Sequence, residues 1–382
     1  MDNDFPVWIL LALPIAFGLG WIASRLDLRQ LRTENRSAPK AYFKGLNHLL
    51  NEQQDQAIDS FIEAIQKDPD TSELHFALGN LFRRRGEYER AVRVHQHLLS
   101  RSDLSSSDRD RAQYALAQDF LRAGILDHAE TALQKLEHSA QYATQAHLAL
   151  LGIYERSRDW ENAGKAALQL EQDDSTQDFS KRRAHFLCER AALAERQGDL
   201  TQAQMLLQQA AEVAPEAVRP LLQQAELARS QGLHEQAYAL LGRALQQSPS
   251  FAPLLAAAYA DAAKSVGQTA QAISTLQALH TQAPSIDLVA ALAWLEDDTS
   301  SKRYLALLQQ QPSLIAAARW LDQEKLRDTP EQESVGRALQ HAIRPLARYR
   351  CAACGFEAQH HYWHCPGCQS WDSYPPRRIE EL

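Results

Sequence analysis

The chain has 382 residues, two to three times the length of a usual single domain, with 45% hydrophobic residues but only 15 glycines and 15 prolines. Together with a mean hydropathy of −0.43, this composition excludes a disordered or collagen-like chain and predicts a body built mostly of helix. The formal net charge of −8 disfavours a general nucleic-acid binder, which needs a basic surface.

The first predicted element is a membrane-spanning helix. Phe5–Ala23 is a run of 19 residues without a charge, close to the roughly 20 that a helix needs to cross the hydrocarbon core. A cleaved secretory signal is the alternative, but it requires a basic amino-terminal region, and this chain begins with Asp2 and Asp4. We therefore predict a retained anchor over residues 1–24.

A basic segment over residues 25–40 sets the predicted orientation. It holds five Lys and Arg residues against two Asp and Glu residues, a net charge of +3. The positive-inside tendency then places the chain after the anchor in the cytoplasm. We expect residues 25–40 to be a linker that can contact anionic lipid.

From Ala41 onward the sequence shows a period of 34 residues. Small residues recur at positions 8, 20 and 27 of each unit, a large residue near position 24 and proline at position 32, a pattern that resembles the tetratricopeptide repeat. Small residues let the two helices of a unit cross closely, and proline ends the second helix. The first two units carry Gly45, Ala57, Phe61, Ala64 and Pro69, and then Gly79, Ala91, His95 and Leu98.

Seven units are visible up to Pro284, and an eighth, degenerate pair of helices is expected over Ile286–Gln311. Spacings of 38 and 40 residues before the third and fifth units predict longer loops around Ser102–Arg109 and Asp173–Ser180. The predicted fold is all-α. A repeat array of seven to eight units covers residues 41–312, and capping helices cover residues 313–345.

Glycine recurs in the turn between the two helices of a unit, where it supplies a left-handed backbone conformation. Because such units bury a core only against their neighbours, we expect one continuous superhelix with a concave, protein-binding groove. Polar residues on the first helices are the groove candidates, although they can equally be the solvated faces of helices. The turn glycines are Gly86, Gly124, Gly198 and Gly232, and the groove candidates are Asn47, His48, Asn80, Arg83, Arg84, Gln118 and Arg122.

Four of the five cysteines form two C-x2-C pairs separated by ten residues near the carboxyl end. Two facing C-x2-C turns supply four sulfurs tetrahedrally, about 2.3 Å from a zinc ion, and leave no open position for catalysis. The spacing predicts a structural metal site, with zinc or iron left open by ligand type. A disulfide pair is disfavoured in a reducing cytosol. The predicted ligands are Cys351, Cys354, Cys365 and Cys368.

The predicted metal module covers residues 346–382 and resembles rubredoxin-like modules, with a shorter spacer than the electron-carrying rubredoxins have. Gly355 and Gly367 are expected to adopt the left-handed conformation. The module holds more aromatic residues than so small a unit can bury, so we expect several to dock on the last helices, Ser313–Leu326 and Pro330–Ile343, as a cap. The fifth cysteine, Cys188, is expected to be a small buried hydrophobe.

Motifs for the commonest enzyme classes are missing from the sequence. It contains no phosphate-cradling G-x-x-x-x-G-K, no H-E-x-x-H and no G-x-S-x-G. The histidines lie scattered along helices without partners at fixed spacing, so none is expected to act as a general base. We predict a protein that is not an enzyme.

The order of parts resembles the lipopolysaccharide assembly protein B (LapB) family. The specific features are the segments Tyr349–Phe356 and Tyr362–Cys368 with Trp371, together with Asn80-Leu-Phe-Arg83 and Arg93-Val-His95-Gln96 in the first units. The resemblance implies a cytosol-facing inner-membrane adaptor with a periplasmic amino terminus. In that family, the adaptor presents the deacetylase LpxC to the membrane protease FtsH, and a membrane-embedded partner senses lipopolysaccharide and acts on the adaptor through the anchor. The resemblance also implies that the metal bound by the four cysteines is iron.

Three alternatives remain open at this point. The module could be an electron carrier on a helical scaffold, or the array could be a general assembly scaffold for envelope complexes. A zinc-ribbon nucleic-acid binder is the third, but residues 341–382 hold only five basic against four acidic residues, which is poor support for phosphate contacts.

Overall fold

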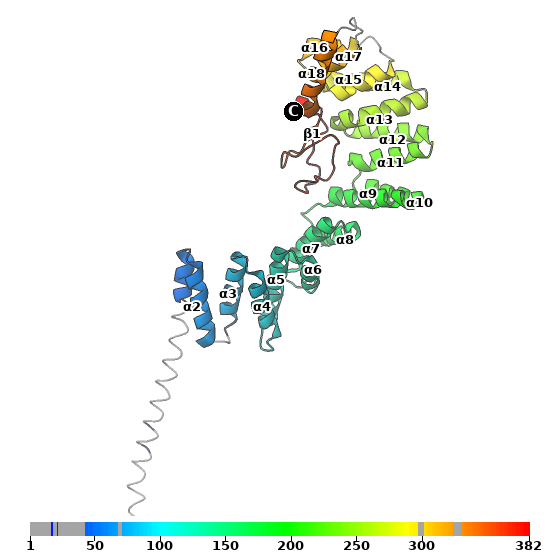
Figure 1. Ribbon diagram of the computed structural model, residues 1–382. Coiled ribbons are helices and arrows are strands. Elements are labelled where there is room, and N and C mark those ends of the chain that lie inside the picture. The colour runs from blue at the N-terminus through cyan, green and yellow to red at the C-terminus, as the bar shows by residue number, and fades with distance from the viewer. Residues whose placement is uncertain (1–16, 18–20, 22–42, 68–70, 297–301, 324–329) are drawn as a thin grey trace, which may run out of the picture. The chain divides into compact units, whose positions relative to one another are not determined.

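The computed structural model describes residues 17, 21, 43–67, 71–296, 302–323 and 330–382. The chain divides into two compact units, Met1–Ser157 and Arg158–Leu382 (Figure 1). Both are built from successive helices, which confirms the prediction of a mostly helical body. Among the described residues, no helix is long and apolar enough to span a membrane. The anchor and linker predicted over residues 1–40 lie outside the described residues, except for Phe17 and Trp21.

The first unit consists of helices that pack consecutively, each against the next along the chain. Helix α3 also contacts α5, so the first helices of neighbouring pairs touch each other as well as their own partners. After the helical residues 43–50, the helices are α2 (Gln54–Lys67), α3 (Ser72–Arg84), α4 (Tyr88–Ser100), α5 (Ser106–Ala123), α6 (Leu126–Gln134) and α7 (Ala143–Ser157).

The second unit continues with further helix pairs and ends in the cysteine-containing module. The predicted eighth pair corresponds to α15 and α16. The helices are α8 (Trp160–Asp173), α9 (Ser180–Arg196), α10 (Leu200–Val213), α11 (Val218–Ser230), α12 (His234–Gln247), the 3-10 helix η1 (Pro249–Phe251), α13 (Ala252–Ser265), α14 (Thr269–Gln282), α15 (Ile286–Leu295), α16 (Lys302–Gln310), α17 (Leu314–Gln323) and α18 (Pro330–Leu346). The module adds β1 (Tyr349–Arg350), β2 (Glu357–Ala358) and the 3-10 helix η2 (Ile379–Glu381).

A residue with positive φ marks the turn inside each of the first seven pairs. These residues follow one another at intervals of 34, 38, 34, 40, 34 and 35, which confirms the predicted period and both predicted insertions. The four predicted glycines adopt this conformation, and two pairs use a residue other than glycine. In chain order the turn residues are Glu52, Gly86, Gly124, Arg158, Gly198, Gly232 and Gly267.

The close helix crossing predicted from small residues is present in the first two pairs. A Cβ atom added to Gly45 would lie 3.1 Å from the Phe61 ring, and one added to Gly79 would lie 2.5 Å from Nε2 of His95. The His95 side chain is fully buried. Glycine is therefore required at position 79, where an added Cβ would overlap the ring, and it relieves a tight contact at position 45.

We expect Gly79→Ala to destabilise the first unit by about 1–3 kcal/mol, because the new methyl group overlaps a buried ring that has no room to move. Gly152→Ala is the matched control, since a Cβ at this helical position on α7 meets no atom within 4 Å. It should stabilise the unit by about 0.5–1 kcal/mol through helix propensity. Amide hydrogen exchange of the helices measures both effects, and equal shifts in the same direction would contradict the assignment.

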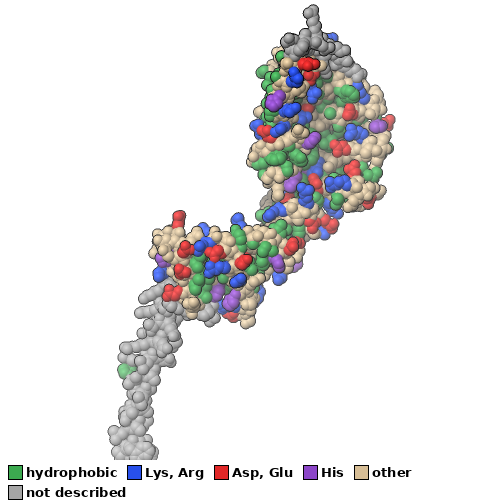
Figure 2. Space-filling view, in the orientation of Figure 1, with side chains coloured by type: hydrophobic (Ala, Val, Ile, Leu, Met, Phe, Trp, Pro, Cys, Tyr) green, Lys and Arg blue, Asp and Glu red, His purple; other side chains and the backbone are tan. Residues whose placement is uncertain are grey.

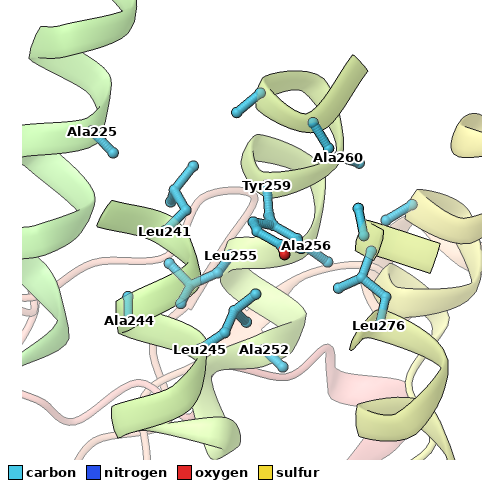
Figure 3. Packing of buried hydrophobic residues seen from close by; sticks show 14 of the residues in the cluster. Ala225, Leu241, Ala244, Leu245, Ala252, Leu255, Ala256, Tyr259, Ala260 and Leu276 are labelled. Atoms are coloured by element: carbon cyan, nitrogen blue, oxygen red, sulfur yellow. The ribbon is translucent and has the colours of Figure 1, made fainter. Parts of the chain in front are cut away.

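The largest core lies in the second unit, where alanines and leucines of successive pairs interdigitate. Figure 3 shows Leu255, Ala256 and Tyr259 of α13 between Leu241 of α12 and Leu276 of α14. The ring of Tyr259 stacks on Tyr238 with centroids 5.0 Å apart. Small residues bring the helices close, so each pair buries its apolar face only against its neighbours.

Charged side chains of both signs are interspersed over the face of each unit seen in Figure 2. This distribution agrees with a net charge of −8 spread over a long chain. A mixed surface of this kind keeps a protein soluble without a strong field of one sign.

Candidate metal centre

The first cysteine turn follows strand β1 directly. β1 pairs antiparallel with β2, with Tyr349 opposite Ala358. Inside this hairpin, the amide of Cys351 donates to the carbonyl of Phe356 at 2.9 Å, and the amide of Gly355 donates to the carbonyl of Cys351 at 2.9 Å. Gly355 has φ +79°, so its predicted left-handed conformation is confirmed.

The second cysteine turn repeats this hydrogen-bond pattern. The amide of Cys365 donates to the carbonyl of Ser370, and the amide of Gln369 donates to the carbonyl of Cys365, both at 2.9 Å. The prediction for Gly367 was wrong, because the residue after the second cysteine carries the positive φ, here Gln369 at +60°. An added Cβ at Gly367 would lie 3.5 Å from Sγ of Cys354, an ordinary van der Waals distance, so the space around this residue does not require glycine either.

The two turns bring the four predicted thiols together. All four Sγ atoms lie within 4.8 Å of one another. Cys351 and Cys368 are separated by 3.8 Å, and Cys354 and Cys365 by 3.7 Å. Four sulfurs about 2.3 Å from a central ion are about 3.8 Å apart in a regular tetrahedron, so the arrangement fits a four-thiolate metal site.

The surroundings of the sulfurs favour a bound cation. Burial opposes ionisation of Cys351, but hydrogen bonds from Ser373 and from backbone amides outweigh it and lower its pKa to about 6. At Cys354 the backbone amide of Phe356 favours the thiolate, but desolvation and the neighbouring sulfurs prevail and raise its pKa to about 12. Four adjacent thiolates therefore need a positive ion to coexist.

The four ligands differ in their access to solvent. Cys351 and Cys365 are buried, whereas Cys354 and Cys368 are exposed on the outer side of the module. The remaining cysteine, Cys188, is fully buried on α9, and burial raises its pKa to about 12. The prediction that Cys188 is a packing residue is confirmed.

The module docks on the middle helices of the second unit, so the prediction that its aromatic residues cap the last helices was wrong. The ring of Trp371 stacks on His185 of α9 at 4.9 Å between centroids, and it meets Trp160 of α8 edge-on at 5.7 Å. Trp363 stacks on Phe251 of η1 at 5.7 Å. These repeat residues are aromatic and lie on the side that faces the module. Near the last helices, Glu380 of the module bonds to Ser313 and Leu314.

A polar network fixes this docked position. Nε2 of His185 lies 2.9 Å from both carboxylate oxygens of Asp372, and its Nδ1 lies 3.3 Å from Nη1 of Arg219 on α11. Arg219 also donates to Glu189 at 2.6 Å. Because Arg219 can only donate, its contact makes Nδ1 of His185 the acceptor and leaves Nε2 to donate to Asp372.

The carboxyl-terminal residues hold the other end of the module. Glu381 accepts a hydrogen bond from the amide of Ile286 at 2.5 Å, and Glu380 accepts one from the amide of Leu314 at 2.6 Å. These carboxylates cap the amino termini of α15 and α17, where unpaired amides and the helix dipole favour negative charge. Arg378 forms a two-point ion pair with Asp287 at 2.9 and 3.0 Å.

Docking therefore covers the first helices of several pairs in the second unit. The module contacts α9, α13 and α15, which are among the helices expected to line a groove there. In this unit the groove side is occupied by the chain's own metal module. The first unit is where the predicted groove residues lie.

Arg83 is the most engaged of these predicted protein-binding residues. It donates to Asp119 at 2.9 Å and to the carbonyl of Ala115 at 3.0 Å, both on α5, and to Oδ1 of Asn80. Asp119 is fully buried and also lies 2.5 Å from Nδ1 of His95. Arg83 thus links α3 to α5.

The other predicted protein-binding residues lie at the surface. Asn47, Arg84 and Arg122 are exposed, and Asn80 and Gln118 are half-buried. They come from the first helices of successive pairs, as the period requires. A binding role for them stays a prediction.

The residues that dock the module were missed by sequence reasoning. His185, Arg219 and Asp372 are far apart in the chain, and each lies in an ordinary local context. The one available signal was the surplus of aromatic residues beside the cysteines, which predicted docking without showing where.

Family models match both parts of the chain. The LapB-type zinc ribbon, a rubredoxin metal binding domain, matches residues 349–375, and tetratricopeptide repeat models match residues 74–110 and 188–252. The chain is therefore a mostly helical tetratricopeptide array with a four-cysteine, rubredoxin-like metal-binding module at its carboxyl end.

Two relatives align over nearly the whole chain. Lipopolysaccharide assembly protein B of Escherichia coli K12 is 29% identical over 389 residues, 97% of this chain and 98% of the relative. The protein of the same name from Haemophilus influenzae is 28% identical over 396 residues, 98% of each chain. Among solved structures, a chain of the Naa15/Naa10 complex bound to HypK-THB aligns with a TM-score of 0.46 and 14% identity, over 80% of this chain and 46% of that one. That likeness is too distant for a functional comparison.

Proposed function

Because the chain belongs to the lipopolysaccharide assembly protein B family, we propose that it is a non-enzymatic adaptor that modulates lipopolysaccharide biosynthesis at the inner membrane. The observation that carries this proposal is the alignment with the E. coli relative over 97% of the chain, repeats and metal module included. In the proposal, the array binds the deacetylase LpxC and presents it to the membrane protease FtsH for degradation.

The proposed adaptor is held at the membrane by residues 1–24. The uncharged run Phe5–Ala23 and the net charge of +3 over residues 25–40 support a single crossing with the amino terminus in the periplasm. The repeats and the metal module then face the cytoplasm. A membrane-embedded partner that senses lipopolysaccharide would act through this anchor.

The proposed metal is one iron ion with a structural role, and zinc is the alternative. When bound, the ion supplies the neutralising charge that four adjacent thiolates require. Cys351, Cys354, Cys365 and Cys368 would hold it, and the hydroxyl oxygens of Ser373 and Ser370 lie 3.3 Å from Sγ of Cys351 and Cys368, respectively. These hydroxyl groups help to orient the ligands and keep the module in the shape that docks on α9.

Client turnover tests the adaptor proposal. Depletion of the protein in growing cells should lengthen the half-life of LpxC without changing the amount of its transcript. The measurement is a chase after translation is stopped, followed by immunoblotting. An unchanged LpxC half-life in depleted cells would overturn the adaptor proposal.

An electron-carrier role is the second candidate, and the exposure of Cys354 and Cys368 favours it, because exposed sulfurs allow electron exchange with a partner. Optical absorption of the purified protein distinguishes the electron-carrier role from the adaptor role. A coloured iron form that is reversibly reduced by an oxidoreductase would support the carrier. A colourless zinc-loaded form that still sustains LpxC turnover would eliminate it.

A further inference from the structure

The four-sulfur cluster has a buried side and an exposed side. Cys351 and Cys365, the first cysteines of the two turns, are 2% and 0% exposed. Cys354 and Cys368, the second cysteines of the turns, lie at the surface. A small reagent dissolved in water therefore reaches one sulfur from each turn before it reaches the buried pair.

Each exposed sulfur lies beside a buried sulfur of the other turn. Sγ of Cys368 is 3.8 Å from Sγ of Cys351, and Sγ of Cys354 is 3.7 Å from Sγ of Cys365. A disulfide bond is about 2.05 Å long, so either pair can form one when its two sulfurs approach by less than about 2 Å. Exposed thiolates are the sulfurs that oxidise first, and a neighbouring thiolate converts the oxidised form into a disulfide.

The segment that docks the module is held by both cysteine turns. This docking segment, Ser370–Ser373, includes Trp371 and Asp372, which contact α9. Its first carbonyl accepts a hydrogen bond from the amide of Cys365 at 2.9 Å, and its last carbonyl accepts one from the amide of Ala352 at 2.7 Å. The position of the docking segment therefore depends on the shape of the two turns.

The module has little core besides the ligands. Within the described residues, its buried cluster consists of Tyr349, Cys351, Cys365 and Tyr374, so two of the four members are themselves ligands. A unit of this size folds largely through metal binding, because its buried apolar surface is too small to hold it together alone. Loss of the thiolates would therefore loosen the turns and free the docking segment.

We propose that the exposed Cys354 and Cys368 are oxidation sites, and that their oxidation by a peroxide releases the metal ion and detaches the module from α9. The Cys368 thiolate attacks one oxygen of hydrogen peroxide, the O–O bond breaks, and a sulfenic acid and a hydroxide ion form. The Cys351 thiolate then attacks the oxidised sulfur, which forms the disulfide and expels a second hydroxide ion. The two sulfurs together lose the two electrons that the peroxide gains. Cys354 and Cys365 react with a second peroxide in the same way, so no thiolate is left to hold the ion.

The test treats the purified full-length chain, in nanodiscs and with the metal it carries, with hydrogen peroxide. Metal content measured by elemental mass spectrometry should fall at least tenfold, from about one ion per chain, and limited proteolysis should then cleave within residues 346–382. Peptide mapping should find Cys351 joined to Cys368 and Cys354 joined to Cys365. During a brief exposure, dimedone, which traps sulfenic acids, should label Cys354 and Cys368. Dithiothreitol, followed by the metal found in the untreated chain, should restore the metal content and the resistance to cleavage.

Two variants separate the steps. Cys188→Ser should release metal at the same rate as the unchanged chain, because Cys188 is buried on α9 outside the cluster. His185→Ala removes the partner of Asp372 and should loosen docking without metal loss. Metal loss from His185→Ala without peroxide would overturn the proposal, and so would full metal content after peroxide treatment or a first dimedone label on Cys351 or Cys365.

The proposed oxidation goes beyond the adaptor function and rests only on the four-thiolate site. Metal content, disulfides and cleavage are measured on purified protein, whereas LpxC turnover is measured in cells. Failure of the proposed oxidation and failure of the adaptor function are therefore distinguishable.

Discussion

A Cys351→Ser substitution is expected to reduce the metal content of the purified full-length chain at least tenfold, from about one ion per chain. Cys351 is a buried member of the four-sulfur cluster and begins the first cysteine turn. In a unit as small as residues 346–382, the free energy of metal binding is largely the free energy of folding. Elemental analysis by mass spectrometry measures the metal, and limited proteolysis should show that residues 346–382 become cleavable.

Cys188→Ser is the matched control, because Cys188 is also a buried cysteine of the second unit but lies on α9 outside the cluster. It should keep its full metal content, whatever stability it loses. Cys368→Ser, at the exposed side of the cluster, should lose metal like Cys351→Ser. Full metal content in both ligand variants would contradict the four-thiolate assignment.

The Asp119→Ala variant is expected to lose about 3–5 kcal/mol of stability in the first unit. The Asp119 carboxylate is fully buried and accepts hydrogen bonds from Arg83 and His95 at 2.9 and 2.5 Å. Removal of the carboxylate leaves the partly buried guanidinium of Arg83 and the buried ring of His95 without this hydrogen-bond acceptor. Amide hydrogen exchange in α3, α4 and α5 should accelerate at least about 100-fold.

Two variants calibrate this prediction. Asp119→Asn keeps the shape and one acceptor oxygen, so it should cost less than the alanine variant. Asp59→Ala removes an exposed carboxylate from α2 and should change stability by less than about 0.5 kcal/mol. If Asp119→Ala and Asp59→Ala gave similar exchange rates, the Asp119 network would not stabilise the first unit.

The repeat period and the metal ligands could be predicted because both depend on neighbours in the sequence. A helix pair needs small residues where its helices cross, as Gly79 beneath His95 shows, and this requirement recurs every 34 residues. Two C-x2-C turns bring four sulfurs together whatever the rest of the chain does. The error at Gly367 has a local cause, since the positive φ of the second turn falls on Gln369, the residue after the second cysteine.

The docking of the module could not be predicted in this way. His185 and Asp372 meet across 187 residues, and neither lies in a pattern that marks it for contact. Arg83 also looked like a groove residue, but its partner Asp119 lies 36 residues away on α5. Such contacts depend on how successive helices stack. The stacking is set by many side chains along the packed face of each helix, and not by a short sequence pattern.

The sequence by itself determined the helix pairs, their turns and the four-thiolate cluster, because each is specified by residues within about one repeat of one another. Only the tertiary structure decided that the metal module occupies the first helices of the second unit, and that Arg83 of α3 pairs with the buried Asp119 of α5 in the first. The physical reason is that a solenoid fixes distant side chains through successive small rotations between neighbouring pairs, and no local pattern encodes their sum.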